Sequence, residues 1–368
     1  MRARILAVAN VTAADQMAWS ELSERSSDPN AFFAPECLLT AHRHLPEAAG
    51  LTLAVVEEDG RWLACLPFAL HRWRLQRRAL VVRCIPGAMG LGTPLIDESG
   101  GLEAAVTLLA GLREHRRDLG SGLVVCEWLA DGPAANNLRR AAAHLGLTVS
   151  EFYRWERAFL RRKDGDDGYW SAALSKDRRR KLAQQRRRLA DGIGPLELVD
   201  RAGDQAAVKE FLRLEASGWK GVRSDGQAFG RRPQSVDFFH ELCERFTAEG
   251  RLSLLSFEAG GRPVAMLCCL RAGQGMFTYR IGHDESLAQY SPGIQAFMAT
   301  LEHFYQKTDA AWIDSSTTPE NRYTRTLFPD TVPLATTIIG VGGIDRLFAW
   351  GLPVVRDALQ RVRPQTDS

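Results

Sequence analysis

Alternating apolar and polar positions predict a β-hairpin in the first part of the chain. One apolar run extends from Leu51 to Glu57 and a second from Arg61 to Phe68, with Asp59-Gly60 between them. An Asp-Gly pair between two such runs is a strong hairpin signal, because both residues tolerate the positive φ of a tight turn. The same pattern returns 201 residues later, so we predict a second hairpin there.

The second hairpin repeats the residues of the first as well as its pattern. It comprises Leu252 to Glu258, a turn at Gly260-Gly261, and Arg262 to Cys269. The positions of the first hairpin that carry the same residue at the constant offset are Leu51, Leu53, Glu57, Gly60, Arg61, Ala64 and Leu66. Hairpins resemble one another, so this agreement alone leaves convergence as an alternative.

The segments around the hairpins extend the repeat. A predicted amphipathic helix precedes each hairpin and opens on a pair of phenylalanines, Phe32-Phe33 or Phe238-Phe239. A strand, a helix and a strand are predicted after each hairpin: Ala79–Ile85, Gly101–Arg117 and Gly122–Ala130 in the first half, and Gly275–Ile281, Gly293–Gln306 and Ala311–Asp314 in the second. Two copies of one order of elements predict a duplicated α/β unit.

The polar, glycine-rich segment from Arg161 to Gly168 predicts the junction between the two copies. A closing amphipathic helix is predicted from Ile344 to Val362, with a break at Pro353. We therefore expect three parts: an N-terminal domain of residues 1–155, a C-terminal domain of residues 156–345, and a helical tail of residues 346–368.

Composition places the chain among ordinary globular proteins. Its 368 residues are 45% hydrophobic and 25% charged, which excludes a disordered chain and a disulfide miniprotein. The net charge of +3 is too small to indicate a nucleic-acid partner by itself. The longest uncharged apolar stretch, Thr331–Ile344, predicts a strand rather than a membrane span.

The cysteines and the N-terminus predict a cytoplasmic protein. Seven cysteines, odd in number and without a Cys-x-x-Cys pair, are typical of buried thiols in a reducing compartment. The first ten residues lack the long apolar core of a secretion signal. A nucleophilic cysteine stays an alternative, whereas neither a Gly-x-Ser-x-Gly motif nor a His/Cys cluster with metal-ligand spacing is present.

A series of short motifs carries a resemblance to a known family. The motifs are Trp19, Phe32–Glu36, Leu66-Pro67 and Gly92–Ile96 in the first half, and Ser175–Leu182, Glu215–Gly221, Gly282–Glu285, Tyr290–Ile294, Trp312–Ser316 and Asn321–Tyr323 in the second. Their order resembles the GNAT acyltransferases, in the doubled form of the FemAB-like and BioF2-like (CelD-type) bacterial N-acyltransferases. The resemblance covers nearly the whole chain and implies a tandem duplicated GNAT-like α/β fold, with mixed sheets flanked by helices.

The family implies transfer of an acyl group from acyl-CoA to an amine of a small molecule or glycan, by direct attack and without a metal. It also implies a role in polysaccharide or cell-envelope biosynthesis. We expect both substrates in the second domain and the first domain to be mainly a scaffold, because Gly90–Leu95, at the corresponding place in the first half, predicts a loop rather than a capped helix start. One departure affects the donor: the usual pyrophosphate loop, Gln/Arg-x-x-Gly-x-Gly/Ala, is replaced by Tyr290–Gln295. Two alternatives therefore stay open, an aminoacyl-tRNA-dependent ligase of the Fem type and a non-catalytic binding factor.

A helix start at which donor phosphates bind is predicted at Tyr290, Ser291, Pro292, Gly293 and Ile294. The Ser291 hydroxyl would cap N–H groups and Pro292 would open the first turn. Free N–H groups and the helix dipole attract anions, and Gly293 would admit a close approach. Arg178 is a further candidate for the donor, and a helix start without a ligand is the alternative reading.

Acyl transfer to an amine needs a neutral nucleophile, donors for the developing oxyanion and a proton for the leaving group. The candidates for the base or for orienting the amine follow predicted strands: Asp314, His283 and Glu285. Tyr279 or Tyr290 would protonate a thiolate, and Glu215 would line the acceptor pocket. The structural alternative is that such carboxylates cap turns and that such tyrosines belong to the core.

A strongly basic helix is predicted near the start of the second domain. Eight basic residues lie between Lys176 and Arg188 against the single acid Asp177, and leucines at 174, 182 and 189 form an apolar stripe. A solvated helix face is the simplest interpretation. A phosphate-bearing ligand or anionic glycan is a second, and RNA such as tRNA a third, although the segment lacks interleaved aromatic residues.

Overall fold

The computed structural model describes residues 1–72, 74, 78–82, 90–163, 174–217, 228–318 and 321–362. Cys84, part of the predicted junction and Trp219 to Gly221 lie outside these ranges. The chain divides into two compact units, one of residues 1–42, 46–156 and 333–368, the other of residues 43–45 and 157–332. The three parts predicted from the sequence, residues 1–155, 156–345 and 346–368, stay a prediction.

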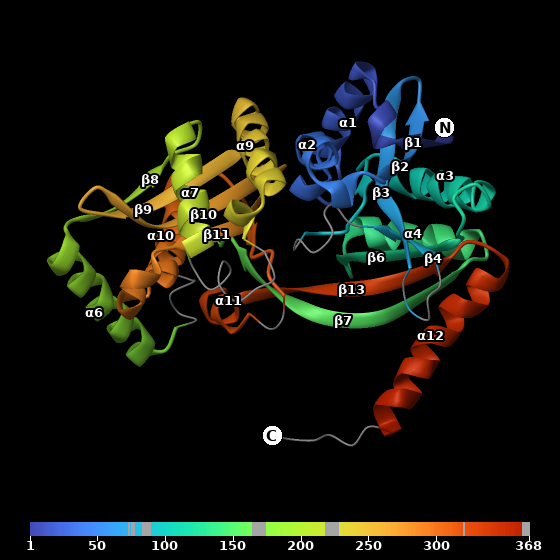
Figure 1. Ribbon diagram of the computed structural model, residues 1–368. Coiled ribbons are helices and arrows are strands. Elements are labelled where there is room, and N and C mark those ends of the chain that lie inside the picture. Colours follow the sequence, from blue (N-terminus) through green and yellow to red (C-terminus); the bar gives the residue numbers. More distant parts are fainter. Residues whose placement is uncertain are drawn as a thin grey trace. The chain divides into compact units, whose positions relative to one another are not determined.

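Both halves of the chain contain helices and strands in a similar order (Figure 1). The first half contains β1 (Arg2–Ala7), α1 (Ala13–Arg25), α2 (Pro35–His44), β2 (Thr52–Glu58), β3 (Arg61–Arg72), β4 (Arg78–Val82), β5 (Leu95–Ile96), α3 (Gly101–Glu114), β6 (Leu123–Leu129), α4 (Pro133–His144) and β7 (Thr148–Arg161). The second half contains α6 (Lys176–Ile193), β8 (Leu196–Asp200), α7 (Gln205–Ser217), α9 (Pro233–Ala248), β9 (Leu252–Ala259), β10 (Arg262–Ala272), β11 (Gly275–His283), α10 (Pro292–Lys307), β12 (Trp312–Asp314), α11 (Arg322–Leu327), β13 (Asp330–Gly340) and α12 (Gly343–Val362).

Strand pairing confirms the duplicated fold. In the first copy β1, β2, β3 and β4 are antiparallel neighbours in that order, and β6 lies parallel beside β4. In the second copy β8, β9, β10 and β11 repeat the antiparallel order, and β12 lies parallel beside β11. The predicted α/β architecture with mixed sheets is therefore present in both copies.

One strand in each copy comes from the other half of the sequence. β13, near the end of the chain, pairs antiparallel with β6, and Leu334 lies opposite Leu129. The last residues of β7 pair antiparallel with β12, and Phe159 lies opposite Asp314. Each sheet is thus completed by a strand that its own half of the chain does not supply.

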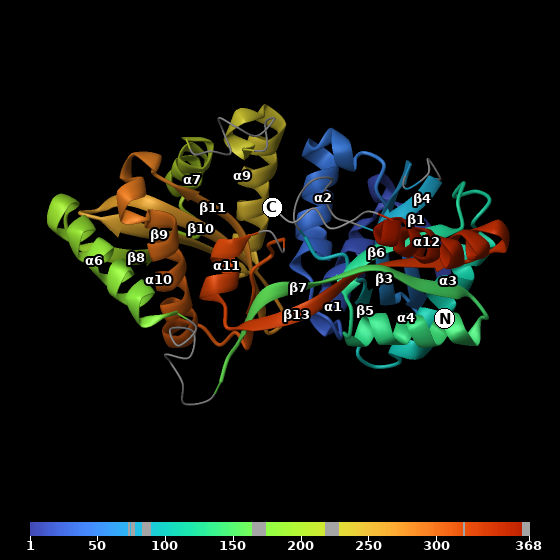
Figure 2. The same ribbon diagram turned by 90° about the horizontal axis from the view of Figure 1, so that it is seen from below.

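Helices cover both faces of the second sheet, which explains why β9 and β10 are apolar almost throughout. On one face Ala265, Leu267 and Cys269 pack in the same core as α6 and α10. On the other face Cys268 contacts Cys243 of α9, and α7 packs against β10 and β11. Figures 1 and 2 show the two helix pairs on opposite sides of these strands.

In the first sheet, α1 and α3 pack on opposite faces. Trp19 of α1 stacks on Trp62 with ring centroids 5.8 Å apart, and its indole N–H donates to the Phe33 carbonyl at 2.9 Å. On the other face α3 approaches β1 so closely that a Cβ on Gly111 would lie 2.2 Å from that of Ala3. The aromatic motif of the first half therefore belongs to the core.

Three expectations for single elements need correction. Phe32-Phe33 form a separate 3-10 turn before α2, and Phe238-Phe239 lie in the middle of α9, which begins at Pro233 because proline suits a first turn. Helix α12 continues through Pro353, since one proline removes only one hydrogen bond of the helix. By contrast, the stretch after Thr331 forms β13 as predicted.

Candidate functional site

Strands β11 and β12 pair over a short length and then part. Phe277 lies opposite Asp314, the last residue of β12, while β11 continues to His283. Beyond Phe277, no strand of the described ranges pairs with the edge of β11 that faced β12. On that side β11 is therefore an edge strand beyond Phe277.

A bulge in β11 lies where the strands part. Cys268 is opposite Arg280 and Cys269 is opposite Thr278, so Tyr279 is an extra residue in β11. A bulge of this kind bends its strand and increases the local twist. The bend accounts for the divergence of β11 from β12.

Asp314 is held firmly at the end of β12. Its side chain is buried, and its Oδ1 accepts the Ser316 main-chain N–H at 2.6 Å. Its Oδ2 lies 3.5 Å from Nη1 of the buried Arg157, and the Thr278 hydroxyl donates to the Ser315 carbonyl at 2.7 Å. The carboxylate is thus charge-compensated and fixes the turn that follows it.

Ser316 is strained and has an unsatisfied hydroxyl. Its φ is +49°, in the left-handed region that costs a non-glycine residue about 1 to 2 kcal/mol. Its Oγ is buried and has no hydrogen-bond partner in the described part of the chain. Strain and an orphan polar atom together are typical of functional positions. Ser316 was predicted only as part of a motif, because nothing in the sequence around it signals either property.

The predicted helix start is present at Pro292, but Ser291 does not cap it. Ser291 has a φ of +54° rather than the extended backbone of a capping residue, and its Oγ accepts a hydrogen bond from Gln185 Nε2 at 3.1 Å. The N–H groups of Ile294 and Gln295 both donate to the Ser291 carbonyl. Among the described residues, the N–H of Gly293 has no partner.

His283 and Glu285 lie at this helix start and away from Asp314. Nε2 of His283 is 3.3 Å from Oε1 of Glu285, and a Cβ on Gly293 would lie 3.4 Å from His283 Nδ1. His283 is six residues beyond the partner of Asp314, which is roughly 20 Å along the strand. The predicted catalytic residues therefore divide between two places joined by β11.

Comparison with known proteins identifies the part of the chain that holds these residues. The family model of the acetyltransferase (GNAT) domain matches residues 176–323. This segment is a GNAT domain. It contains β11, α10 and β12, and thus both groups of residues. No curated protein matches the chain by sequence.

Solved structures extend the fold to both copies. FemX has a TM-score of 0.60 at 9% identity, covering 96% of this chain and 100% of its own. A protein of unknown function from Bacteroides thetaiotaomicron has a TM-score of 0.56 at 13% identity, covering 89% and 97%. The C-terminal domain of a putative lysylphosphatidylglycerol synthetase from Agrobacterium fabrum has a TM-score of 0.54 at 13% identity, covering 93% and 96%. With the GNAT match, these structures confirm the predicted resemblance to doubled, FemAB-like GNAT proteins.

In the GNAT domain Glu215 anchors the main chain. Its Oε2 accepts the Phe229 N–H at 2.7 Å, and its Oε1 accepts from Arg280 Nη1 at 3.2 Å. The Arg280 guanidinium lies over the Phe229 ring, whose centroid is 6.2 Å from that of the buried Tyr279. Both oxygens of Glu215 are therefore engaged, and its predicted acceptor role stays a proposal.

Helix α6 of the GNAT domain lies against the helix start. Leu182 and Leu189 are buried as the apolar stripe predicts, and Gln185 donates to both Ser291 Oγ and the Gln289 carbonyl. Tyr290 packs against the same core. Arg178 is half-buried seven residues before Gln185, about 10 Å along the helix axis.

Two cavities are lined by residues other than those of this site, one by α3 and the start of α12, the other mainly by α9. In the described ranges, no group of three or more His, Cys, Asp or Glu side chains is placed to hold a metal ion. Within the same ranges, no helix combines the length and apolarity needed to cross a membrane.

The cysteines at 37, 65, 126, 243, 268 and 269 are free and buried, and burial raises the pKa of the Cys269 thiol to about 12.

Proposed function

We propose that the GNAT domain transfers an acyl group from acyl-CoA to an amine of a small-molecule or glycan acceptor. The observation that carries the proposal is the parting of β11 from β12 at the Tyr279 bulge, beside Asp314 and Ser316. Beyond Phe277, β11 has no neighbouring strand on that side in the described ranges, so an extended pantetheine arm can run alongside it as an added strand does at a sheet edge.

The two ends of β11 suit the two ends of such a donor. The N–H of Gly293 and the nearby His283 can bind the diphosphate at the start of α10, while Tyr290, Ser291, Pro292 and Ile294 shape that turn. The extended pantetheine arm then follows β11 for roughly 20 Å toward Asp314. Arg178 would add positive charge to the diphosphate end. The similarity to FemX and to a lysylphosphatidylglycerol synthetase domain supports an acceptor in cell-envelope or polysaccharide biosynthesis.

The reaction forms one bond and breaks another in direct transfer. The amine nitrogen attacks the thioester carbonyl, the C–N bond forms, and the C–S bond breaks as the amine loses a proton and the sulfur gains one. Asp314 orients the amine and receives its proton, with Arg157 balancing the charge before attack. The Ser316 hydroxyl donates to the developing oxyanion and Tyr279 supplies the proton for sulfur.

Titration calorimetry with acetyl-CoA and longer acyl-CoAs, followed by thiol-release assays with amine acceptors, tests the proposal. D314N and S316A should bind acyl-CoA as the wild type does but lose turnover, D314N completely and S316A by about tenfold or more. S256A is the matched control, because Ser256 is also buried with an unpartnered hydroxyl but lies in β9. Absence of binding at millimolar acyl-CoA would contradict the proposal, and unchanged turnover in D314N would remove Asp314 from the mechanism.

An aminoacyl-tRNA donor is the second candidate. One observation favours it: α6 presents mostly exposed basic residues next to the helix start. In that case aminoacyl-tRNA, but not acyl-CoA, would support transfer, and R179E/R187E would abolish it. Binding of an acceptor without transfer from either donor would favour the non-catalytic binding factor.

A further inference from the structure

Helix α12 exposes an apolar face. Ile344, Leu347 and Trp350 are 66%, 70% and 66% exposed. Their spacing of three residues places them along one side of the helix. The opposite side already has a partner, because Ala349 and Leu352 pack in a core with residues of β6 and β13. The helix is therefore apolar on two sides, and only one of them is covered.

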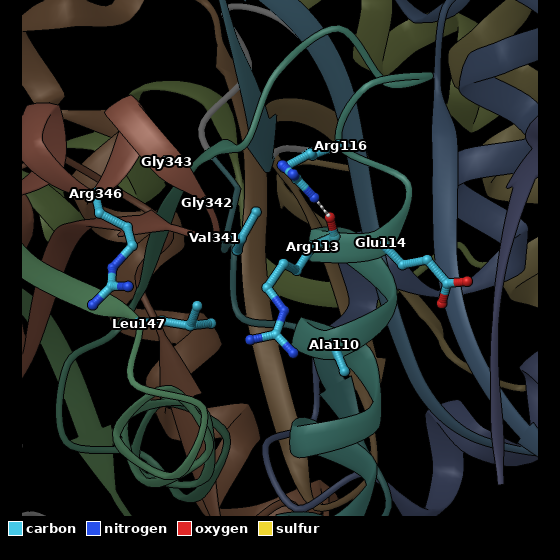
Figure 3. A pocket seen from close by; sticks show the side chains of 9 residues that line it. All are labelled: Ala110, Arg113, Glu114, Arg116, Leu147, Val341, Gly342, Gly343 and Arg346. Atoms are coloured by element: carbon cyan, nitrogen blue, oxygen red, sulfur yellow. Dashed lines mark hydrogen bonds between the residues drawn. The ribbon is translucent and has the colours of Figure 1, made fainter.

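An arginine-lined cavity of about 420 Å³ adjoins the start of the same helix. Arg113 and Arg116 reach it from the end of α3, and Arg346 from the first turn of α12 (Figure 3). Arg116 donates to the Arg113 carbonyl at 2.6 Å. The carboxylate among the lining residues, Glu114, points away from the arginines in Figure 3.

Arg113 and Arg346 are exposed and form no ion pair with any carboxylate in the described part of the chain. Their guanidinium groups extend into the cavity from α3 and from α12 (Figure 3). Planar guanidinium groups bind phosphate oxygens in bidentate geometry, and two or three of them around one concavity suit a phosphate-bearing group.

The cavity and the apolar face form one surface. Arg346 lines the cavity and lies one helical turn before Trp350, on the same side of α12. Basic residues bordering exposed Trp, Leu and Ile are typical of helices that lie in the interface of an anionic bilayer. Self-association through this face would bring the arginines of two copies together at the two-fold axis, so like charges disfavour it.

We propose that α12 docks the protein on an anionic phospholipid surface. Ile344, Leu347 and Trp350 enter the boundary between headgroups and acyl chains, and Arg113 and Arg346 bind a lipid phosphate. The proposal concerns the first unit and does not depend on the acyl-transfer activity of the GNAT domain.

Co-sedimentation of the full chain with vesicles tests this surface. Vesicles of phosphatidylcholine with about 30% phosphatidylglycerol should bind the protein at low salt, pure phosphatidylcholine should not, and 0.5 M NaCl should weaken binding. L347S/W350S and R113Q/R346Q should each reduce binding about tenfold or more. The matched controls are M17S, which changes a 67% exposed methionine of α1, and R140Q, which changes an exposed arginine of α4; both should bind as the wild type does.

Three results would overturn the proposal. The first is a wild-type protein that stays in the supernatant with anionic vesicles at low salt. The second is binding that neither double variant reduces. The third is a concentration-dependent dimer that L347S/W350S dissociates, which would assign the apolar face to self-association. Circular dichroism spectra and thermal unfolding of every variant separate loss of the surface from loss of the fold.

Discussion

The carboxylate of Glu215 accepts hydrogen bonds on both oxygens, from the main chain at Phe229 and from Arg280. These partners lie 14 and 65 residues away in sequence. The sequence predicted Glu215 on a helix, as a carboxylate that lines the acceptor pocket. Its partners could not be predicted, since they depend on how α7 packs against β11. Asp314 was named as a catalytic candidate, which stays a prediction, whereas Ser316 was given no role because backbone strain has no signature in residue type.

Loss of the Glu215 carboxylate should destabilise the fold strongly. E215A leaves the Arg280 guanidinium and the Phe229 N–H without their partner, so we expect a loss of about 3 to 5 kcal/mol in the free energy of unfolding. Urea denaturation measures it. The control E210Q breaks the Glu210–Arg213 pair, which is more exposed and should contribute less than about 1 kcal/mol. Equal effects of the two variants would contradict the anchoring role.

Asp97 gives the first unit a predicted sensitivity to acid. Burial alone would raise the pKa of Asp97, but hydrogen bonds from Arg61, Ser99 and Arg25 outweigh it and lower this pKa to about 2. In the unfolded chain the pKa of an aspartate is about 3.9. The stabilisation is therefore fully present above about pH 4 and is lost as the pH falls toward 2.

Comparison of the wild type with D97N tests this expectation. The difference in unfolding free energy between the two proteins should be constant from pH 7 to about pH 4.5 and should shrink below pH 4. Urea denaturation at each pH measures it. A difference that stays constant down to pH 2.5 would show that the Asp97 ion pairs do not control acid stability.

At the scale of elements, the sequence predicted the position of the turn between β11 and α10 but not its backbone conformation. The Ser-Pro pair marked the first helical residue correctly, because proline suits a first turn. The left-handed Ser291 was missed, since its hydrogen bond with Gln185 comes from a helix more than a hundred residues earlier. The Tyr279 bulge was missed for a similar reason: its pattern of buried residues resembles that of a regular strand.

Gly293 tests whether the helix start binds the donor. A Cβ there would meet His283 only at ordinary contact distance, so G293A should keep the thermal midpoint of the wild type. The added methyl group would stand where a phosphate approaches the Gly293 N–H, so acyl-CoA affinity should fall about tenfold. Calorimetric titration measures it. The control G351A adds a methyl group in open space on α12 and should bind as the wild type does. Unchanged affinity in G293A would remove the phosphate site from this turn.

For the whole molecule, the repeat at a 201-residue offset predicted the duplication, and the strand order confirms it. The exchange of β7 and β13 between the halves was not predicted. Comparison of the two copies aligns residues that are local in sequence, whereas the pairing of Leu334 with Leu129 joins distant segments. Hydrophobic patterning identifies a strand but not its neighbour.

Residues 1–156 alone should not form a stable fold. Without β13, β6 loses the strand that pairs with it from Leu123, which lies opposite Gly340, to Leu129, which lies opposite Leu334. An apolar unpaired edge aggregates readily. We expect no cooperative thermal transition from this fragment, measured by circular dichroism. A chain in which a flexible Gly/Ser linker joins residues 1–156 to residues 330–362 should recover the transition. Cooperative melting of the short fragment would show that β13 is dispensable.

The pairing of β6 with β13 also affects when the first copy can fold during synthesis. As the polypeptide leaves the ribosome, β6 emerges long before β13, its antiparallel partner, because almost the whole of the second copy is translated between them. The nascent first half therefore stays incomplete beside β6 until β13 has been synthesised. Premature termination between β6 and β13 would release a product whose first copy lacks its last strand, so such products are expected to be degraded.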